Sequence, residues 1–513
     1  MRKTLKTWVY VNATIAVALS LYLFLVPAAI LVRDLRDPGL RGGQIPHCAF
    51  RWHKSLSPKY ERWARQRVAS GRAGHLTTGN IAGTEWPLFG SVFYLWATEA
   101  LQEAVQENPS FCRTPPSRYA RGAIEAAAAL VADPNHADWV KQYWGPGYLE
   151  KENLFYRMLL ISALTSYQKL SDDAKYEELL RRQVESLAKE LEESPYGLLD
   201  DYPGQCYPID IVPAIAAIRR ADAVLRTDHS AFVARAIRGF QEERLDRHTG
   251  LPAYLVDSKT GRAQDSARGV GLSFMLTWAP QLWPRTARDW YAEYERQFWQ
   301  QGTWLAGFRE YPRDVDVGWL ALNDVDAGPV VGGYGVAASA FGIGAARVMG
   351  RTDQAYKLAA EGLVASWPLP DGTLLVPRIL SNLSDAPYLG EAATLFALTR
   401  RSLEPAQGDA RARPPVAVYV GLAILLALGV YEIVASLRKL RRWRRADPRW
   451  YVPSPQVQVT VWLVLLAAAA AAWLAIGLFA LVFLLAALIL PWRWRTSVED
   501  SAYKNGEHTR SEQ

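Results

Sequence analysis

Cysteine and histidine are scarce in this sequence, with three and seven copies in 513 residues. Cys48, Cys112 and Cys206 do not have the spacing of metal ligands, and the histidines are scattered without one either. The sequence therefore predicts no metal site. In an oxidising compartment Cys48 and Cys112 either pair and leave Cys206 free, or all three remain thiols.

Charged side chains are also missing from the middle of three long apolar runs, so the sequence indicates no ion pathway through a membrane. The first run, 8–32, is apolar apart from Asn12, Thr14 and Ser20, and it can cross a hydrocarbon core of about 30 Å. Basic residues precede it and no clear small-residue cleavage site follows, which favours an uncleaved anchor over a signal peptide. The second run, 416–437, predicts another transmembrane helix.

The third apolar run, 459–490, would be about 48 Å long as one helix, which is long for one crossing and slightly short for two. Basic residues flank both ends, with Arg449 before it and Arg493 after it. Matching flanks favour a helical hairpin that turns near Gly477 and leaves the tail, 491–513, in the cytoplasm. The sequence thus predicts about four spans, and one long tilted helix is the alternative.

The formal net charge of +7 does not indicate nucleic-acid binding, because much of the excess lies in one cluster after 416–437. The cluster consists of Arg438, Lys439, Arg441, Arg442, Arg444, Arg445 and Arg449. Positive charge marks the cytoplasmic side of a membrane, and the N-terminus is basic too. We therefore expect a multi-pass protein of the bacterial inner membrane, with the lipid bilayer as its partner and its large domain in the periplasm.

The region 40–405 reads as a succession of helices separated by Gly, Pro, Asn and Asp. The predicted helices are 57–71, 86–106, 117–133, 151–170, 172–192, 208–226, 229–245, 267–281, 285–301, 330–349, 352–367 and 387–402. The helix at 208 is expected to start a few residues later, because Pro213 fits only in a first turn. Alternation typical of strands is scarce and confined to linkers such as Thr373–Val376.

Twelve helices in six antiparallel pairs predict an all-α (α/α)6 toroid, with an inner ring, an outer ring and a cleft at one end. A helical solenoid is the runner-up, but no repeat of fixed period is present. In a toroid the longer loops between helices line the cleft. Those loops are 193–208, 246–267, 302–329 and 368–386.

The loop before residue 208 holds carboxylates, phenols and a thiol within one short stretch. Its acidic, phenolic and thiol side chains include Asp200, Asp201, Tyr202 and Cys206, and Asp210 follows just after the loop. A thiolate near a helix N-terminus is stabilised by the macrodipole, and neighbouring acids exchange protons when burial tunes their pKa values. The structural alternative is that the acids cap the helix and Cys206 is a small core residue.

A second polar group follows Arg309 and includes Glu310, Asp324 and Asp326. Carboxylates across a cleft suit general acid–base chemistry, including glycoside hydrolysis, although Asp also populates turns for local reasons. Glu85 precedes an apolar segment, and we favour complementation of a helix macrodipole over a position in the cleft.

Two glycine-rich stretches, 332–335 and 342–344, lie in or beside a predicted helix. No strand precedes them, so they indicate close helix packing rather than dinucleotide binding.

The stretch Tyr202-Pro203-Gly204-Gln205-Cys206 resembles the aromatic-x-x-Gln-Cys motif of the linalool dehydratase-isomerase family. The stretch Asn153-Leu154-Phe155-Tyr156 is a looser match, and 250–254 and 265–271 are weaker still, so the resemblance covers about 80–400. It implies an (α/α)6 barrel and cofactor-free dehydration or isomerisation of an allylic isoprenoid alcohol in an apolar cavity. The chain has Gly197 and Leu159 where the family has a further cysteine and a histidine.

The resulting hypothesis is a membrane-anchored lyase or isomerase that acts on a small apolar or amphipathic substrate. Cys206, Tyr202 and Asp201 would form its acid–base cluster, with Tyr156 and Glu310 across the cleft.

Two alternatives belong to other functional classes. A periplasmic glycosidase or lyase would bind a glycan and use Glu310 with Asp201 or Asp324. A non-catalytic envelope protein would bind a ligand in a degenerate cleft. Oligomer formation is compatible with all three.

Overall fold

The computed structural model describes residues 2–322, 326–409, 411–445 and Val464. Helices account for 64% of the structure, so the expected helical class is confirmed. The chain divides into two compact units: Met1–Ile30 with Gly421–Gln513, here called the terminal unit, and Leu31–Val420, the central unit. The hairpin predicted over 459–490 and the predicted tail, 491–513, lie outside the described residues apart from Val464.

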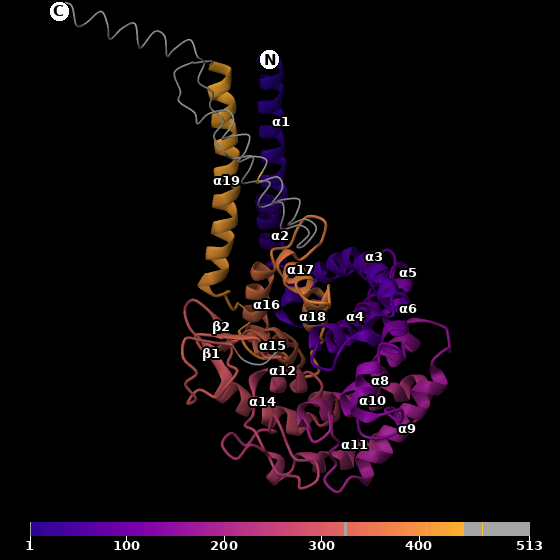
Figure 1. Cartoon of the computed structure of the whole chain (residues 1–513). Coiled ribbons are helices and arrows are strands. Elements are labelled where there is room, and N and C mark those ends of the chain that lie inside the picture. The colour runs from indigo at the N-terminus through magenta and orange to yellow at the C-terminus, as the bar shows by residue number, and fades with distance from the viewer. Residues whose placement is uncertain (1, 323–325, 410, 446–463, 465–513) are drawn as a thin grey trace, which may run out of the picture. The chain divides into compact units, whose positions relative to one another are not determined.

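The terminal unit contains an N-terminal helical segment and most of a C-terminal helix. The N-terminal segment joins α1 (Arg2–Ser20), a π-helical turn (Leu21–Leu25) and α2 (Val26–Asp34), and the later helix is α19 (Val416–Arg445) (Figure 1). The Ser20 hydroxyl donates to the Gly429 carbonyl at 2.9 Å. A Cβ on Gly429 would lie 2.5 Å from the Leu25 side chain, so the glycine lets the two helices approach closely.

Two stretches in the described part of the chain are long and apolar enough to cross a membrane, Tyr10–Asp34 and Val416–Arg438. They match the predicted spans 8–32 and 416–437 within a few residues. Their length and composition are those of membrane anchors, and the first, near the N-terminus, also meets the criteria for a signal sequence.

The central unit holds the remaining described helices and five short strands (Figure 1). Its longer helices are α3 (His47–Ala69), α4 (Ile81–Glu107), α6 (Arg121–Val131), α8 (Leu154–Leu170), α9 (Glu177–Glu193), α10 (Pro208–Leu225), α14 (Pro284–Phe298), α15 (Val336–Val348), α16 (Thr352–Ser366) and α18 (Leu389–Leu398). Its shorter helices are α5 (Pro116–Tyr119), α7 (Asp138–Trp144), α11 (Ser230–Ala236), α12 (Gly269–Leu276), α13 (Ala279–Leu282) and α17 (Leu375–Asn382).

The strands form two small antiparallel sheets beside these helices. Strand β1 (Trp299–Gln301) pairs with β2 (Ala306–Phe308), and Trp299 lies opposite Phe308. Strand β4 (Pro329–Val331) lies between β3 (Leu320–Leu322) and β5 (Tyr334–Gly335), with Val331 opposite both Leu320 and Tyr334. The strands expected near Thr373–Val376 do not form, because α17 begins at Leu375 and only Leu374 makes a bridge, to Pro368.

Helices α4, α8, α10, α12, α15 and α18 pack against one another in succession, and α18 also packs against α4. Helix α8 is buried along nearly its whole length. Helix α9, which packs on α8, instead buries one stripe that includes Leu180, Val184, Leu187 and Leu191. This difference distinguishes helices inside the unit from the amphipathic helices that cover them.

Most predicted helices are present, and the differences have local causes. The helix at 208 begins at Pro208 and carries Pro213 in its interior, so the later start expected from Pro213 is wrong. The helix expected from residue 330 begins only at Val336, because Gly332 and Gly333 adopt left-handed φ values of 58° and 83° in the turn between β4 and β5. The helix expected over 267–281 is divided into α12 and α13, and Pro280 cannot donate the backbone hydrogen bond that a continuous helix needs.

The glycines of α15 do serve close packing, as the sequence indicated. A Cβ on Gly342 would lie 2.5 Å from the ring of Phe308, which is fully buried and stacks on Tyr294 with ring centroids 4.5 Å apart. Gly362 in α16 has more room, since the nearest atom to an added Cβ is a methyl of Ile343 at 3.6 Å.

We expect Gly342→Ala to destabilise the protein by about 1–3 kcal/mol, because the added methyl overpacks the Phe308 ring. The matched variant Gly362→Ala should instead be stabilised by about 0.5–1 kcal/mol, since alanine favours a helix interior over glycine. Thermal unfolding of both variants measures the difference. Equal midpoints would contradict the close packing at Gly342.

Candidate active site

The central unit contains a cavity of about 930 Å³ whose wall is mostly apolar. All four long loops that the sequence predicted to line a cleft contribute to the wall, and this prediction is confirmed. Their contributions include Tyr202, Tyr254, Leu305 and Val376. The remaining wall comes from helices, chiefly α4, α12, α15, α16 and α18.

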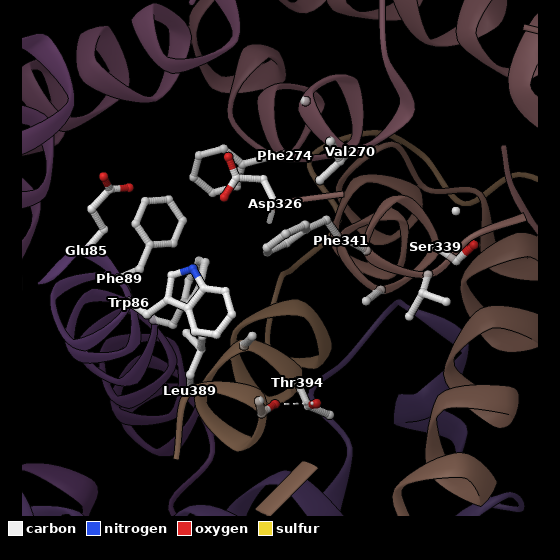
Figure 2. A pocket seen from close by; sticks show the side chains of 18 of the residues that line it. Glu85, Trp86, Phe89, Val270, Phe274, Asp326, Ser339, Phe341, Leu389 and Thr394 are labelled. Atoms are coloured by element: carbon white, nitrogen blue, oxygen red, sulfur yellow. Dashed lines mark hydrogen bonds between the residues drawn. The ribbon is translucent and has the colours of Figure 1, made fainter. Parts of the chain in front are cut away.

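A cluster of aromatic rings forms one side of the cavity. Phe89 of α4 stacks on Phe155 of α8 with ring centroids 5.4 Å apart, and Phe274 of α12 lies 5.7 Å from Phe89. Phe341 of α15 lies 5.6 Å from Phe274. Figure 2 shows Phe89, Phe274 and Phe341 around the same space, so helices far apart in sequence supply one continuous aromatic surface.

Glu85 reaches this surface from α4. Asn80 caps the helix, because its side chain accepts a hydrogen bond from the Gly83 amide at 3.0 Å, and the helix begins at Ile81. Glu85 and Phe89 are four residues apart and therefore share one helix face, which lines the cavity. The favoured sequence interpretation, complementation of the macrodipole, is thus wrong, and the spacing of Glu85 with the aromatic residues was the signal for its position.

Glu85, Asp210, Asp326 and Tyr202 form a polar cluster on a mostly apolar wall, which also carries Glu361 and several hydroxyl groups. The Tyr202 hydroxyl donates a hydrogen bond to the Glu85 carboxylate. Asp210 lies in the first turn of α10, which Pro208 starts. Figure 2 shows Glu85 and Asp326 among the side chains that line the cavity together with Phe89 and Phe274.

The apolar surroundings shift the titration of this cluster. Burial, together with the negative charge of Asp326, raises the pKa of Glu85 to about 7, against the hydrogen bond from Tyr202 that lowers it. Burial and the charges of Asp326 and Glu85 raise the pKa of Asp210 to about 8. At neutral pH a carboxyl group with a pKa of about 8 is mostly protonated and one with a pKa of about 7 is about half protonated, so both can act as general acids.

A tight turn places the Tyr202 side chain in the cavity wall. The Gly204 amide donates to the Asp200 carboxylate at 2.7 Å, and the Gln205 amide donates to the Tyr202 carbonyl at 2.8 Å. Gly204 has a φ of 80°, in the left-handed region that glycine tolerates. The polar residues of the sequence motif therefore build the turn, and the Tyr202 ring is the part of it that joins Glu85.

The other predicted members of this loop lie behind the cavity wall. Cys206 is fully buried and its carbonyl accepts the Val256 amide at 2.9 Å. Burial and the nearby Asp201 carboxyl raise the pKa of the Cys206 thiol, which disfavours a thiolate. Asp201 is also buried and accepts the Tyr207 amide at 2.8 Å, and burial with the charge of Asp210 raises its pKa.

The two residues expected across the cleft are buried in other contacts and do not line the cavity. The Tyr156 hydroxyl donates to the Val131 carbonyl at 3.1 Å. Glu310 accepts from Arg268 at 3.1 Å and from the Val270 amide at 3.0 Å, which holds the start of α12. Asp324, the partner in the glycosidase alternative, lies outside the described residues.

The two positions where the chain departs from the resembled family also lie away from the cavity wall. Gly197 has a φ of 71°, a backbone conformation in which a cysteine would be strained. Leu159 is fully buried in α8.

The three cysteines are free thiols, so the alternative with a Cys48–Cys112 disulfide is not realised. Among the residues that the structure describes, no group of three or more His, Cys, Asp or Glu side chains is arranged to hold a metal ion.

The reactivity of each cysteine thiol should follow the burial of its side chain. We expect Cys112, which is only half-buried, to react with a maleimide in the native protein, and Cys48 and Cys206 to react only after unfolding. Mass spectrometry of labelled peptides measures the order. Rapid labelling of Cys206 in the folded chain would show that its thiol is accessible and reactive after all.

The stability of Asp210→Asn should depend on pH in a defined direction. A folded-state pKa of about 8 lies above the value of about 4 in an unfolded chain, so the native protein holds an extra proton between those values. The wild type therefore loses stability as pH rises through this window, whereas the variant cannot ionise there. We expect the unfolding temperature of the variant relative to the wild type to increase from pH 5 to pH 9.

Glu99→Gln provides the control of opposite sign. Although burial raises the pKa of Glu99, the charges of Arg220 and Lys169 lower it to about 2. Its ionised form therefore stabilises the fold above the unfolded value, and the contribution is lost as pH falls toward 2. This variant should be less stable than the wild type at pH 7, with a difference that shrinks in acid. A pH-independent difference for Asp210→Asn would contradict its raised pKa.

The sequence matches no protein-family model and no curated protein. The features that bear on function are therefore those of the cavity itself, a mostly apolar space with aromatic walls and a cluster of carboxyl groups that includes two with raised pKa values.

Proposed function

We propose that the protein is a membrane-anchored (α/α)6 enzyme of the linalool dehydratase-isomerase type, which dehydrates or isomerises an allylic isoprenoid alcohol without a cofactor. The observation that carries the proposal is the presence of Glu85 and Asp210, with pKa values of about 7 and 8, on an aromatic cavity wall. A proton donor, an apolar space and aromatic rings are the features that such chemistry requires.

The packing of the inner helices supports the toroid. The succession α4, α8, α10, α12, α15 and α18 closes on itself, since α18 contacts α4. The helices α3, α6, α9, α14 and α16 each contact one or two members of that succession. In the proposed toroid these two groups are the inner and outer rings, and the cavity lies at the end where the long loops meet.

The cluster can carry out both proton transfers of a dehydration, one to the hydroxyl and one from carbon. Glu85 or Asp210 gives its proton to the substrate hydroxyl, the C–O bond breaks, and water leaves with the bonding electron pair. The resulting allylic cation is stabilised by the faces of the aromatic rings around Phe89 and Phe274. For dehydration, the carboxylate left by the proton donor removes a proton from the neighbouring carbon, and the C–H bonding pair forms the second double bond of a diene. For isomerisation, the released water instead adds a lone pair to the other end of the allylic cation and gives a proton back to that carboxylate, which yields the isomeric alcohol.

The composition of the wall favours an isoprenoid over a sugar. The aromatic rings and aliphatic side chains bury hydrocarbon and keep bulk water from the cation, whereas a glycan needs many polar partners. In this proposal Tyr202 is the one residue of the sequence-based set that contacts substrate, and it orients Glu85. Cys206, Asp201, Tyr156 and Glu310 support the wall.

The membrane topology is part of the proposal. The apolar helices Tyr10–Asp34 and Val416–Arg438 serve as spans, and the run 459–490 adds a hairpin to give about four. Basic residues at the N-terminus and after Val416–Arg438 support a cytoplasmic position for those ends, which leaves the central unit in the periplasm.

A non-catalytic carrier of apolar molecules is the second candidate. The departures at Gly197 and Leu159 favour it, because the first of the family's two cysteines and the family's histidine are missing. A carrier would use the same cavity without proton transfer.

Gas chromatography with mass spectrometry of the full chain in detergent, incubated with linalool, geraniol and farnesol, tests the proposal. We expect dehydrated or rearranged products. Glu85→Gln and Asp210→Asn should each lower kcat/KM by about 10²–10⁴-fold, the usual effect of losing a general acid. Cys206→Ala should have a much smaller effect, because the thiol does not line the cavity.

Folded protein that binds these alcohols without converting them would favour the carrier, and folded protein that neither binds nor converts them would contradict both candidates. A severe loss in Cys206→Ala with intact stability would return the acid–base role to the thiol.

A further inference from the structure

The two places where the chain leaves the central unit lie together beside α16. The Arg41 guanidinium donates to the Ala412 carbonyl at 3.2 Å and lies over the ring of Tyr356, 4.0 Å from its centroid. The Tyr356 hydroxyl donates to the Leu35 carbonyl at 3.0 Å. The short helix Pro38–Arg41 packs on α16 as well. Both membrane-length helices therefore connect to the central unit at one site.

The same helix forms part of the cavity wall. Leu358, Glu361 and Gly362 of α16 line the cavity, and Glu361 accepts the Ala306 amide of β2 at 2.9 Å. One helix thus separates the cavity from the points where the chain enters its apolar segments. Figure 2 shows that the cavity extends from Glu85 to Ser339, whose hydroxyl accepts the Phe308 amide of β2 at 3.1 Å.

The turn between β1 and β2 is attached to the start of α19. The Val416 amide donates to the Thr303 carbonyl at 3.2 Å, and the Ala417 amide donates to the Trp304 carbonyl at 3.1 Å. Trp304 is nevertheless 62% exposed. Its neighbour Leu305 is exposed and also lines the cavity.

A second exposed apolar segment lies next to this turn. Trp319 is 74% exposed, and both leucines of β3, Leu320 and Leu322, are exposed on one face of the strand. The Gly332 amide donates to the Trp319 carbonyl at 2.7 Å, while the Gly332 carbonyl accepts from the Gln300 side chain of β1 at 3.2 Å. These bonds join the two hairpins, so Trp304, Trp319, Leu320 and Leu322 form what is here called the apolar hairpin patch.

We propose that the apolar hairpin patch rests in the interfacial layer of the lipid bilayer, and that the cavity receives its occupant from the lipid past Leu305. The inference rests on the membrane anchoring in the proposed function. An exposed apolar patch bonded to the first residues of a membrane-length helix lies at the level where that helix enters the bilayer, and tryptophan is enriched at that level. Leu305 belongs to both the anchored turn and the cavity wall.

Site-directed spin labelling of the full chain tests this inference. Nitroxides are attached to Trp304→Cys, Trp319→Cys and, as an exposed control on α9, Arg182→Cys, each in a Cys112→Ser background. Figure 1 shows α9 on the side of the central unit away from β1 and β2. The proteins are placed in nanodiscs of phosphatidylcholine with phosphatidylglycerol, and collision rates with oxygen and with a nickel chelate are measured.

We expect labels at 304 and 319 to collide with oxygen several-fold more than with the chelate, and the label at 182 to show the reverse. Aqueous collision ratios at 304 and 319, in protein that resists carbonate extraction from membranes, would overturn the inference and leave the anchoring intact. Chain released by carbonate would overturn both. The labelled residues are exposed, so unchanged unfolding temperatures establish that each variant is folded.

Discussion

Removal of carboxyl groups from water is the constraint on which the site depends. Six helices that pack in succession surround a space lined by aromatic rings, and Glu85 and Asp210 open into it. Ionisation of either group there is costly, because little solvent or positive charge is present to stabilise the carboxylate. Each acid therefore retains its proton to a pH at which an exposed carboxyl would have lost it.

Several residues that the sequence suggests as catalytic instead stabilise the local structure. Glu310 is paired with Arg268 and holds the start of α12. Asp200 and Asp201 accept backbone amides of the turn that presents Tyr202. Such groups are rich in hydrogen bonds, whereas no cation is among the groups that shift the pKa values of Glu85 and Asp210. The hydrogen bonds and positive charges around each carboxyl group, rather than its residue type, therefore distinguish carboxylates that hold the fold from candidate proton donors.

The position of α16 links the cavity wall to the points where the chain enters its two apolar helices. Tyr356 of α16 contacts Leu35, which follows the first apolar helix, and Arg41, which in turn binds Ala412 ahead of the second. Glu361 and Leu358 of the same helix line the cavity. An isoprenoid alcohol dissolves in lipid far better than in water, so a cavity close to the membrane attachment would shorten its path. The exposed tryptophans beside Leu305 are consistent with such a path.

The sequence by itself determined the helical class, the two apolar helices and most helix positions, because apolar periodicity and proline and glycine signals act over a few residues. It also identified the loops around the cavity and Tyr202 within them. Only the tertiary structure decided that Tyr202 interacts with Glu85 and that Asp210 lines the same cavity, while Cys206, Tyr156 and Glu310 lie outside its wall. Residues far apart in the chain set the burial and the charge around each acid, and those two quantities fix its pKa.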